Sequence, residues 1–203
     1  MTLRIGTGAG YAADRIEPAR DLAEQGRLDW LVFECLAERT LAHGHLARMK
    51  DPARGYNTML ERRLAAVLPA CRAQGTAIVT NMGAANVPAA GRVALETARR
   101  CGLEGTLIAT VEGDDVTALM TPDTLLPELG QTIGESGLRV VGANAYLGTE
   151  VLLQALRHEP AVTIAGRVAD PALFLAPLAQ RFGWALDDWP RLGAGTVIGH
   201  LLE

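Results

Sequence analysis

Apolar and polar residues alternate along the chain in blocks that fit strands and helices in turn. Six short runs are almost wholly apolar, as expected for strands buried on both faces of a sheet. These predicted strands cover residues 3–6, 29–35, 76–81, 106–112, 138–144 and 161–166. The segments between them carry apolar residues at helical spacing. They predict helices over residues 18–25, 36–50, 56–74, 88–102, 122–128, 148–157, 171–182 and 187–203.

This alternation predicts an α/β fold with a mainly parallel sheet and helices on both faces. An open, doubly wound sheet is our first expectation, and a partial (β/α) barrel is the alternative. No internal repeat or linker divides the sequence, so residues 1–203 predict a single domain. A chain of this length can bury a core without disulfides or metals.

Charge and composition narrow the possible partners. The formal net charge is −4, which argues against nucleic-acid binding. No apolar run is long enough to span a bilayer, and the N-terminus lacks a signal-peptide pattern, so we expect a cytoplasmic protein with no membrane partner. Cys35, Cys71 and Cys101 form no CxxC pair, and we expect buried thiols, with a catalytic Cys35 as the alternative. We assign no residue to a metal on histidine or cysteine spacing.

Polar side chains and glycines gather directly after the predicted strands. In parallel α/β folds this is the edge where ligands bind. We therefore select these residues as the candidate site. They are Gly8, Gly10, Glu34, Asn81, Asn86, Glu112, Asp114, Asp115, Asn144, Arg167 and Asp170.

Glu112, Asp114 and Asp115 place three carboxylates within four residues. They suit a general acid or base, or ligands of a divalent cation such as Mg²⁺, and a solvated turn is the alternative. Arg167 either pairs locally with Asp170 or clamps a carboxylate or phosphate with its planar fork. We favour the clamp, because the charge follows a buried strand.

The remaining candidates have polar or glycine-turn roles. Asn81, Asn86 and Asn144 would contact substrate, although asparagine equally favours turns. The glycine turn at Gly8 and Gly10 would receive a phosphate or carboxylate. It also fits G-x-G-x-x-A with Glu34 as a ribose ligand. Asp14 and Pro18, however, place the helix start later than that dinucleotide fingerprint requires.

Several of these stretches together resemble the acyclic terpene utilisation (AtuA-like) family, formerly a domain of unknown function. The resemblance covers nearly the whole chain. Members of the family are longer, so the resemblance implies an N-terminal part that is truncated at its C-terminus. The matching stretches are residues 4–6, 26–32, 36–40, 50–56, 79–83, 111–115, 166–174, 182–184, 187–189 and 195–203.

The resemblance implies bacterial breakdown of acyclic terpenes such as citronellol and geraniol through CoA thioesters, by a reaction not assigned for the family. The expected substrate is thus a branched acyl carboxylate or CoA thioester. The resemblance assigns no catalytic residue, and we select Glu112, Asp114, Asp115 and Arg167 as catalytic groups from their positions at the strand ends. The turn reads Gly10-Tyr11-Ala12-Ala13-Asp14 where the family has Gly-Phe-Trp-Gly-Asp. If that loop contacts substrate, the departure predicts a substrate other than a terpenoid acid.

Two other functions stay open at this point. One is an NAD(P)-dependent oxidoreductase that uses the glycine turn and Glu34. The other is a non-enzymatic assembly module, in which the apolar end of the last helix pairs with another chain. That end contains Val197, Ile198, Leu201 and Leu202. We expect either a homo-oligomer or a missing C-terminal region to complete the protein.

Overall fold

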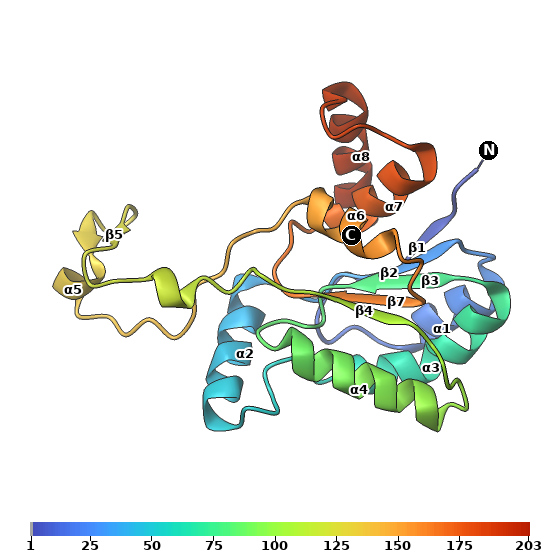
Figure 1. Ribbon diagram of the computed structural model, residues 1–203, viewed down its shortest axis with the longest axis horizontal. Helices are drawn as coiled ribbons and strands as arrows, with labels where there is room; N and C mark the ends of the chain where they lie inside the picture. The colour runs from blue at the N-terminus through green and yellow to red at the C-terminus, as the bar shows by residue number, and fades with distance from the viewer. Residues whose placement is uncertain (1) are drawn as a thin grey trace.

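The structure, a computed structural model, describes residues 2–203 and has the predicted α/β architecture (Figure 1). Five parallel strands form an open sheet in the order β1-β2-β3-β7-β4. The open sheet with helices on both faces confirms the first expectation over the partial barrel. The strands are β1 Ile5–Ala9, β2 Trp30–Phe33, β3 Ala77–Thr80, β4 Ile108–Val111 and β7 Val162–Ala165.

Helices cover the two faces of the sheet as two separate layers. Helices α1, α3 and α4 pack on one another and on one face, while α6 and α7 cover the other face, with α8 outside α7 (Figure 1). Helix α2 lies beyond the ends of the strands. The helices are α1 Glu17–Gln25, α2 Glu38–Lys50, α3 Leu60–Gln74, α4 Val87–Arg100, α6 Thr149–Leu156, α7 Ala172–Phe182 and α8 Trp189–Leu202.

The two faces of the sheet carry different side chains because successive strand residues point to opposite sides. Leu31 and Phe33 of β2 and Ile78 of β3 join the core under α1, α3 and α4. Val32 and Val79 belong to the core under α6 and α7. Burial on both faces explains why these strands read as continuous apolar runs.

Residues 116–143 leave the sheet after β4 and return before α6. This segment holds the short helix η1 Thr117–Leu119, the two-residue strands β5 Leu125–Leu126 and β6 Gln131–Thr132, and helix α5 Ile133–Ser136. Figure 1 shows it extending away from the rest of the molecule. We call residues 119–140 the arm.

Two element predictions in this region are wrong. The stretch 138–144 is not a strand of the sheet, because β7 pairs with both β3 and β4 and takes the position beside them. Its residues are exposed or half-buried, and Asn144 forms only an isolated bridge with Asp115. The stretch 122–128 is not a helix, because it forms the first half of the β5–β6 hairpin.

The other predicted strands and helices are present, with small boundary shifts. The first strand begins at Ile5 and runs to Ala9, so it includes Gly6 and Gly8. Within residues 2–203, no helix combines the length and the apolar character needed to cross a membrane.

Candidate functional site

All five strands of the sheet run parallel, so their carboxyl ends meet at one edge, as predicted. The polar residues gathered there form two connected clusters. One follows β2 and β3, and the other follows β4 and β7. We describe each cluster in turn and then the hollows that they border.

The first cluster centres on Glu34, which is buried directly after β2. Its Oε1 accepts a hydrogen bond of 2.7 Å from Asn81 Nδ2 and one of 2.9 Å from the Leu36 amide. Asn81 Oδ1 in turn accepts from the Cys35 amide at 2.8 Å. Burial is the main cause that raises the pKa of the Glu34 carboxyl, against the lowering effect of these hydrogen bonds.

Asp170 and Glu203 complete a group of carboxylates around Glu34. One oxygen from each of the three lies within 4.8 Å of the others. Oxygen ligands of this kind suit a hard cation. Asp170, however, already pairs with the Arg167 guanidinium, so any cation would compete with that ion pair.

Arg167 is only 1% exposed, and its donors are used inside the chain. Nε and one terminal nitrogen donate to the Val168 carbonyl, the other terminal nitrogen donates to the Leu36 carbonyl at 2.6 Å, and Asp170 receives the ion pair. The guanidinium also lies over the Tyr146 ring, 4.3 Å from its centre. The local ion pair is therefore what the structure contains, and Arg167 does not offer a free fork for an anion.

The second cluster is a chain of three side chains from β4, the segment before α6, and α2. Asp114 Oδ2 accepts from the Arg167 amide at 2.7 Å and from Asn144 Nδ2 at 2.8 Å. Asn144 Oδ1 lies 2.6 Å from His45 Nε2. Since Asn144 uses its amide hydrogen for Asp114, its oxygen accepts from His45 Nε2–H, and His45 Nδ1 keeps its lone pair.

A close approach of the backbone makes this arrangement possible. A Cβ atom at Gly166, which follows β7, would lie 2.6 Å from the Asp114 carboxylate oxygens. Glycine is thus required at position 166 for Asp114 to lie against the strand end.

The three carboxylates after β4 border one hollow of about 130 Å³, but among the described residues they do not form a group whose oxygens lie within 4.8 Å of one another. Asp114 is buried, whereas Glu112 and Asp115 are exposed. Asp115 pairs with Arg48 of α2 at 3.2 Å. A divalent-cation site made from Glu112, Asp114 and Asp115 is therefore not formed in this arrangement, and the carboxylates that approach one another are those around Glu34.

Asn86 has a structural position at the start of α4. Its side-chain oxygen accepts from the Ala89 amide and caps the helix, while Nδ2 donates to the carbonyls of Pro52 and Arg54. All of its hydrogen-bonding groups are thus used within the chain. The turn interpretation applies to Asn86, whereas Asn81 and Asn144 lie within the two polar clusters.

The glycine turn lacks the geometry of a dinucleotide site. Gly8 lies inside β1, where a Cβ atom would come within 2.5 Å of the Phe33 ring. The Gly10 amide donates to Asp14 Oδ2 at 3.0 Å, and α1 begins only at Glu17. The fingerprint requires a helix to begin directly after the turn. In this structure the helix begins too late to meet that requirement.

The hollows at this edge include two larger ones that lie on either side of α2. The polar hollow has a volume of about 210 Å³ and is lined by Glu38, His45, Asn144, Tyr146 and Arg167, among others. The hydroxyl of Tyr146 donates a hydrogen bond to the Glu38 carboxylate, which lowers the pKa of Glu38.

The apolar hollow, of about 400 Å³, lies on the other side of α2. Ala12 and Ala13 after β1, Leu36 after β2, Ala47 of α2 and Ala84 contribute to its apolar lining. Its size falls in the usual range of small-molecule pockets. Tyr56, Asn57 and Thr58 supply polar groups at its wall.

Cys35 also lines the apolar hollow, and its thiol lies 3.0 Å from the Arg63 guanidinium. Burial raises the pKa of the Cys35 thiol to about 12, although Arg63 lowers it. A thiol with such a pKa is protonated near neutral pH, which does not favour the catalytic thiolate. Cys71 is buried in the same way, while Cys101 is half-buried.

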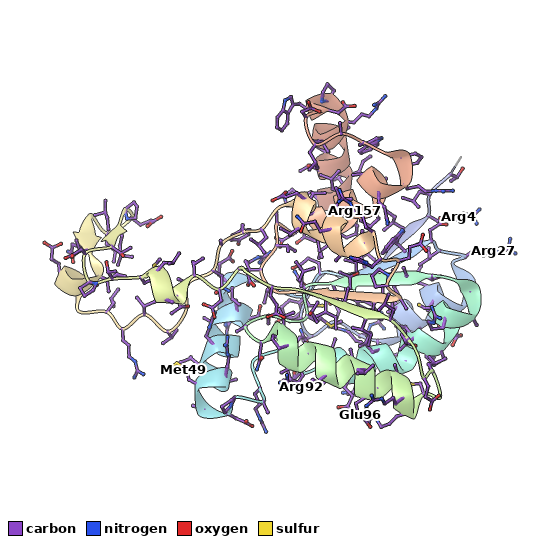
Figure 2. The ribbon with its side chains drawn as sticks, in the orientation of Figure 1. Arg4, Arg27, Met49, Arg92, Glu96 and Arg157 are labelled. Atoms are coloured by element: carbon purple, nitrogen blue, oxygen red, sulfur yellow. The ribbon has the colours of Figure 1, made fainter. Side chains whose placement is uncertain are left out.

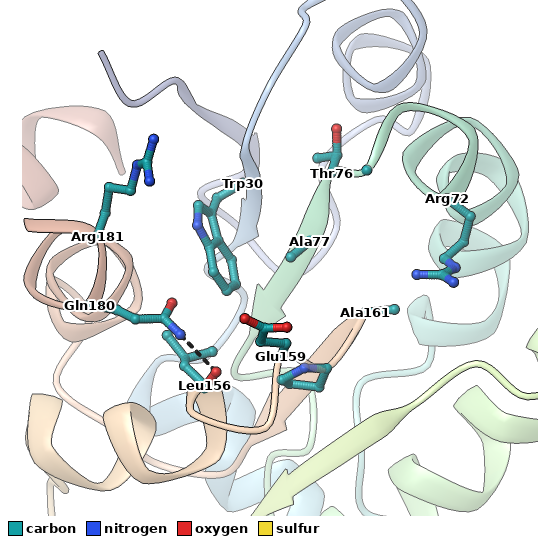
Figure 3. A pocket seen from close by; sticks show the side chains of 11 residues that line it. Trp30, Arg72, Thr76, Ala77, Leu156, Glu159, Ala161, Gln180 and Arg181 are labelled. Carbon is teal, nitrogen blue, oxygen red and sulfur yellow. Dashed lines mark hydrogen bonds between the residues drawn. The ribbon is translucent and has the colours of Figure 1, made fainter. Parts of the chain in front are cut away.

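A further hollow of about 400 Å³ lies at the amino ends of the strands (Figure 3). Arg72 and Arg181, on opposite sides of it, stand in the last turns of α3 and α7. Positive charges in this position interact favourably with the helix dipoles. This hollow contains none of the residues selected from the strand carboxyl ends.

Sequence reasoning missed four residues at the carboxyl edge: His45, Tyr146, Glu38 and Arg63. His45 and Asn144 are 99 positions apart, and Tyr146 and Glu38 are 108 apart. Only Arg63 left a local signal, because it is a charged residue within the apolar stripe of α3. Its side chain is fully buried and donates to the carbonyls of Tyr11 and Asp14.

Comparisons with known proteins give one match, to a family model. No curated protein and no solved structure matches the chain. A family model described as acyclic terpene utilisation family protein AtuA matches residues 3–203. Because this match spans almost the whole sequence, the chain belongs to the acyclic terpene utilisation family.

Proposed function

We propose that the chain is an enzyme, or the catalytic domain of one, that acts on a branched acyl carboxylate or its CoA thioester in acyclic terpene breakdown. The observation that carries this proposal is the apolar hollow of about 400 Å³ at the carboxyl edge of the sheet. A hydrocarbon chain gains free energy there in proportion to the apolar surface it buries. Family membership supports a terpenoid skeleton as that hydrocarbon.

The polar hollow supplies groups for proton transfer on the acyl group. His45 is the proposed base, because Asn144 occupies its Nε2–H and leaves Nδ1 free of that hydrogen bond. Asp114 acts through Asn144 and is a positioning residue. Tyr146 donates a hydrogen bond to Glu38 in the same hollow, and its hydroxyl is the proposed acid.

Helix α2 separates the two hollows, and its N-terminal end borders both. Leu36, which precedes α2, lines the apolar hollow, and Glu38 in its first turn lines the polar one. An acyl chain in the apolar hollow could place its carbonyl at this end of α2, next to the proposed acid–base groups. The arrangement does not support the alternative that relies on a dinucleotide, the NAD(P)-dependent oxidoreductase.

Ligand binding tests the proposal. We expect citronellate, a branched acid of ten carbons, to raise the melting temperature of the protein, since a ligand at about 100 times its Kd stabilises by about 2.7 kcal/mol. Butyrate at the same concentration should have a much smaller effect. The substitution Ala12→Phe, which fills the apolar hollow, should weaken citronellate binding at least about 10-fold.

Ala53→Phe is the matched control, because Ala53 is an exposed loop residue that does not line the apolar hollow. It should leave citronellate binding unchanged. Equal binding by wild type and Ala12→Phe, or no binding of citronellate and citronellyl-CoA at millimolar concentration, contradicts the proposal.

A further inference from the structure

The arm packs on itself rather than on the rest of the molecule. Its contacts join β5 to β6 and β6 to α5, and backbone bonds tie Gly134 to Pro122 and Ile133 to Thr124. At its base, the Val116 amide donates to the Ala143 carbonyl and the Ala143 amide donates to Thr117 Oγ1. The arm is thus a projecting unit with a closed neck (Figure 1).

The surface of the arm is unusually apolar for a segment so far from the core. Leu119 is 70% exposed, and Leu125, Leu129 and Leu138 are each more than half exposed. Such a projecting group of leucines marks an interaction surface. The arm also carries three carboxylates, Asp123, Glu128 and Glu135, against one guanidinium, that of Arg139.

Helix α2 presents the complementary surface. Leu46 and Met49 are exposed on it, and Figure 2 labels Met49 on the side of α2 toward which the arm extends. Leu46 lines a surface hollow of about 570 Å³ that Lys50 and Arg54 also border. Arg39 and Lys50 add two cations to α2, while Arg48 is already paired with Asp115.

We propose that the arm of one chain docks on the α2 surface of a second copy. The arm's leucines cover Leu46 and Met49, and its carboxylates face the cations of α2. Because arm and α2 lie on the same side of the molecule, a two-fold axis that places one arm on the partner's α2 also places the second arm on the first α2. Arm and α2 together provide roughly the 20–30 residues that one side of a standard interface contains.

This interface would also close the apolar hollow. His43 and Ala47 of α2 line both the apolar hollow and the surface hollow next to it. The docked arm of the second copy therefore covers the mouth of the apolar hollow. The proposed dimer depends only on the arm and α2. Failure of the acyl-substrate proposal would therefore leave the dimer proposal unaffected.

Sedimentation velocity of the full chain between 1 and 100 µM tests the docking. We expect a wild-type dimer. The double substitutions Leu125→Glu/Leu129→Glu in the arm and Leu46→Glu/Met49→Glu in α2 should each raise the dissociation constant at least about 10-fold. A mixture of these two variants retains one intact arm and one intact α2 surface, so it should associate more strongly than either variant alone.

Circular dichroism checks that the exposed substitutions leave the fold intact. Leu107→Glu is the matched control, because Leu107 is an equally exposed leucine on the body, and it should leave the dimer unchanged. A monomeric wild type at 100 µM overturns the proposal. So does a dimer that survives both double substitutions, or one that is lost only on Ile198→Glu/Leu201→Glu in α8.

Discussion

Glu34 is a carboxyl group held where water cannot solvate it well. Its burial raises its pKa above the usual value, so folding favours its protonated form. The group therefore stabilises the fold at pH values below its unfolded pKa, and this contribution is lost as the pH rises through the higher pKa of the folded state. A buried carboxyl group with a shifted pKa is typical of a functional site.

The substitution Glu34→Gln tests this reasoning. Glutamine can still accept from Asn81 and Leu36 but carries no charge, so we expect the variant to be more stable than wild type at pH 8. The gain should shrink at pH 4.5. Urea unfolding at both pH values measures the difference.

Glu96→Gln provides the control, because Glu96 is exposed on α4, and its stability should stay within about 0.5 kcal/mol of wild type. A Glu34→Gln variant that is less stable than wild type at pH 8 would contradict the expected sign.

One oxygen of Asp114 accepts two hydrogen bonds. Different substitutions of Asp114 should therefore lower the free energy of unfolding by different amounts. In Asp114→Asn, the remaining carbonyl oxygen can accept from both Arg167 and Asn144, so we expect a loss of about 1 kcal/mol in the free energy of unfolding. Asp114→Ala leaves both donors unpaired and should cost about 2–4 kcal/mol. Chemical denaturation compares the two. Equal losses would mean that the charge, and not the two bonds, is what matters.

How far the site residues could be predicted depends on whether their signal is local. Glu34, Asn81 and Asp114 follow apolar strands directly, and parallel strands bring their ends together whatever lies between. The pairing of Asn144 with His45 depends on how the segment before α6 crosses α2. No periodicity encodes that crossing. The hydrogen bonds of Arg167 could not be predicted for a related reason, since its partners include the distant Leu36 carbonyl.

At the scale of elements, the arm is the part of the chain least tied to the core. Its hairpin is a ladder of two residues on each strand, too short for independent stability. Hydrogen bonds in the neck join Val116 and Thr117 to Ala143. A short linker can therefore connect the two sides of the neck in place of the arm. We therefore expect the arm to contribute to the proposed docking between copies and not to the stability of the body.

Replacing residues 119–140 with a short Gly-Ser linker tests this division. We expect the free energy of unfolding of the remaining body at sub-micromolar concentration to stay within about 1 kcal/mol of wild type. The shortened chain should be monomeric in sedimentation. A loss of more than about 3 kcal/mol would mean that the arm supports the core.

Periodicity predicted the sheet strands well and the arm poorly. Buried strands such as β2 and β7 have no polar positions, so their apolar runs stand out from the sequence. The stretch 138–144 has the same kind of run, yet it lies outside the sheet. An apolar run indicates that a segment is not fully solvated. It does not indicate which helix, strand or loop packs over that segment.

At the scale of the whole molecule, stability is expected to fall from the sheet outward. Strands β3 and β7 lie inside the sheet and pair on both sides. Amide hydrogen exchange should therefore be slowest in β3 and β7 and fastest in the arm, where few backbone bonds are buried. Exchange of the arm should slow as protein concentration rises. Concentration-independent exchange there would argue against docking between copies.

The position of β7 has a consequence for how the chain acquires its fold over time. The last strand in the sequence fills the gap between β3 and β4, pairing Thr80 with Ile164 and Thr110 with the same residue. Until residues 162–165 leave the ribosome, β3 and β4 have an open slot between them. Strand pairings of such long sequence separation form slowly and leave apolar edges exposed. The nascent chain is therefore most vulnerable to aggregation in the interval between synthesis of β4 and arrival of β7.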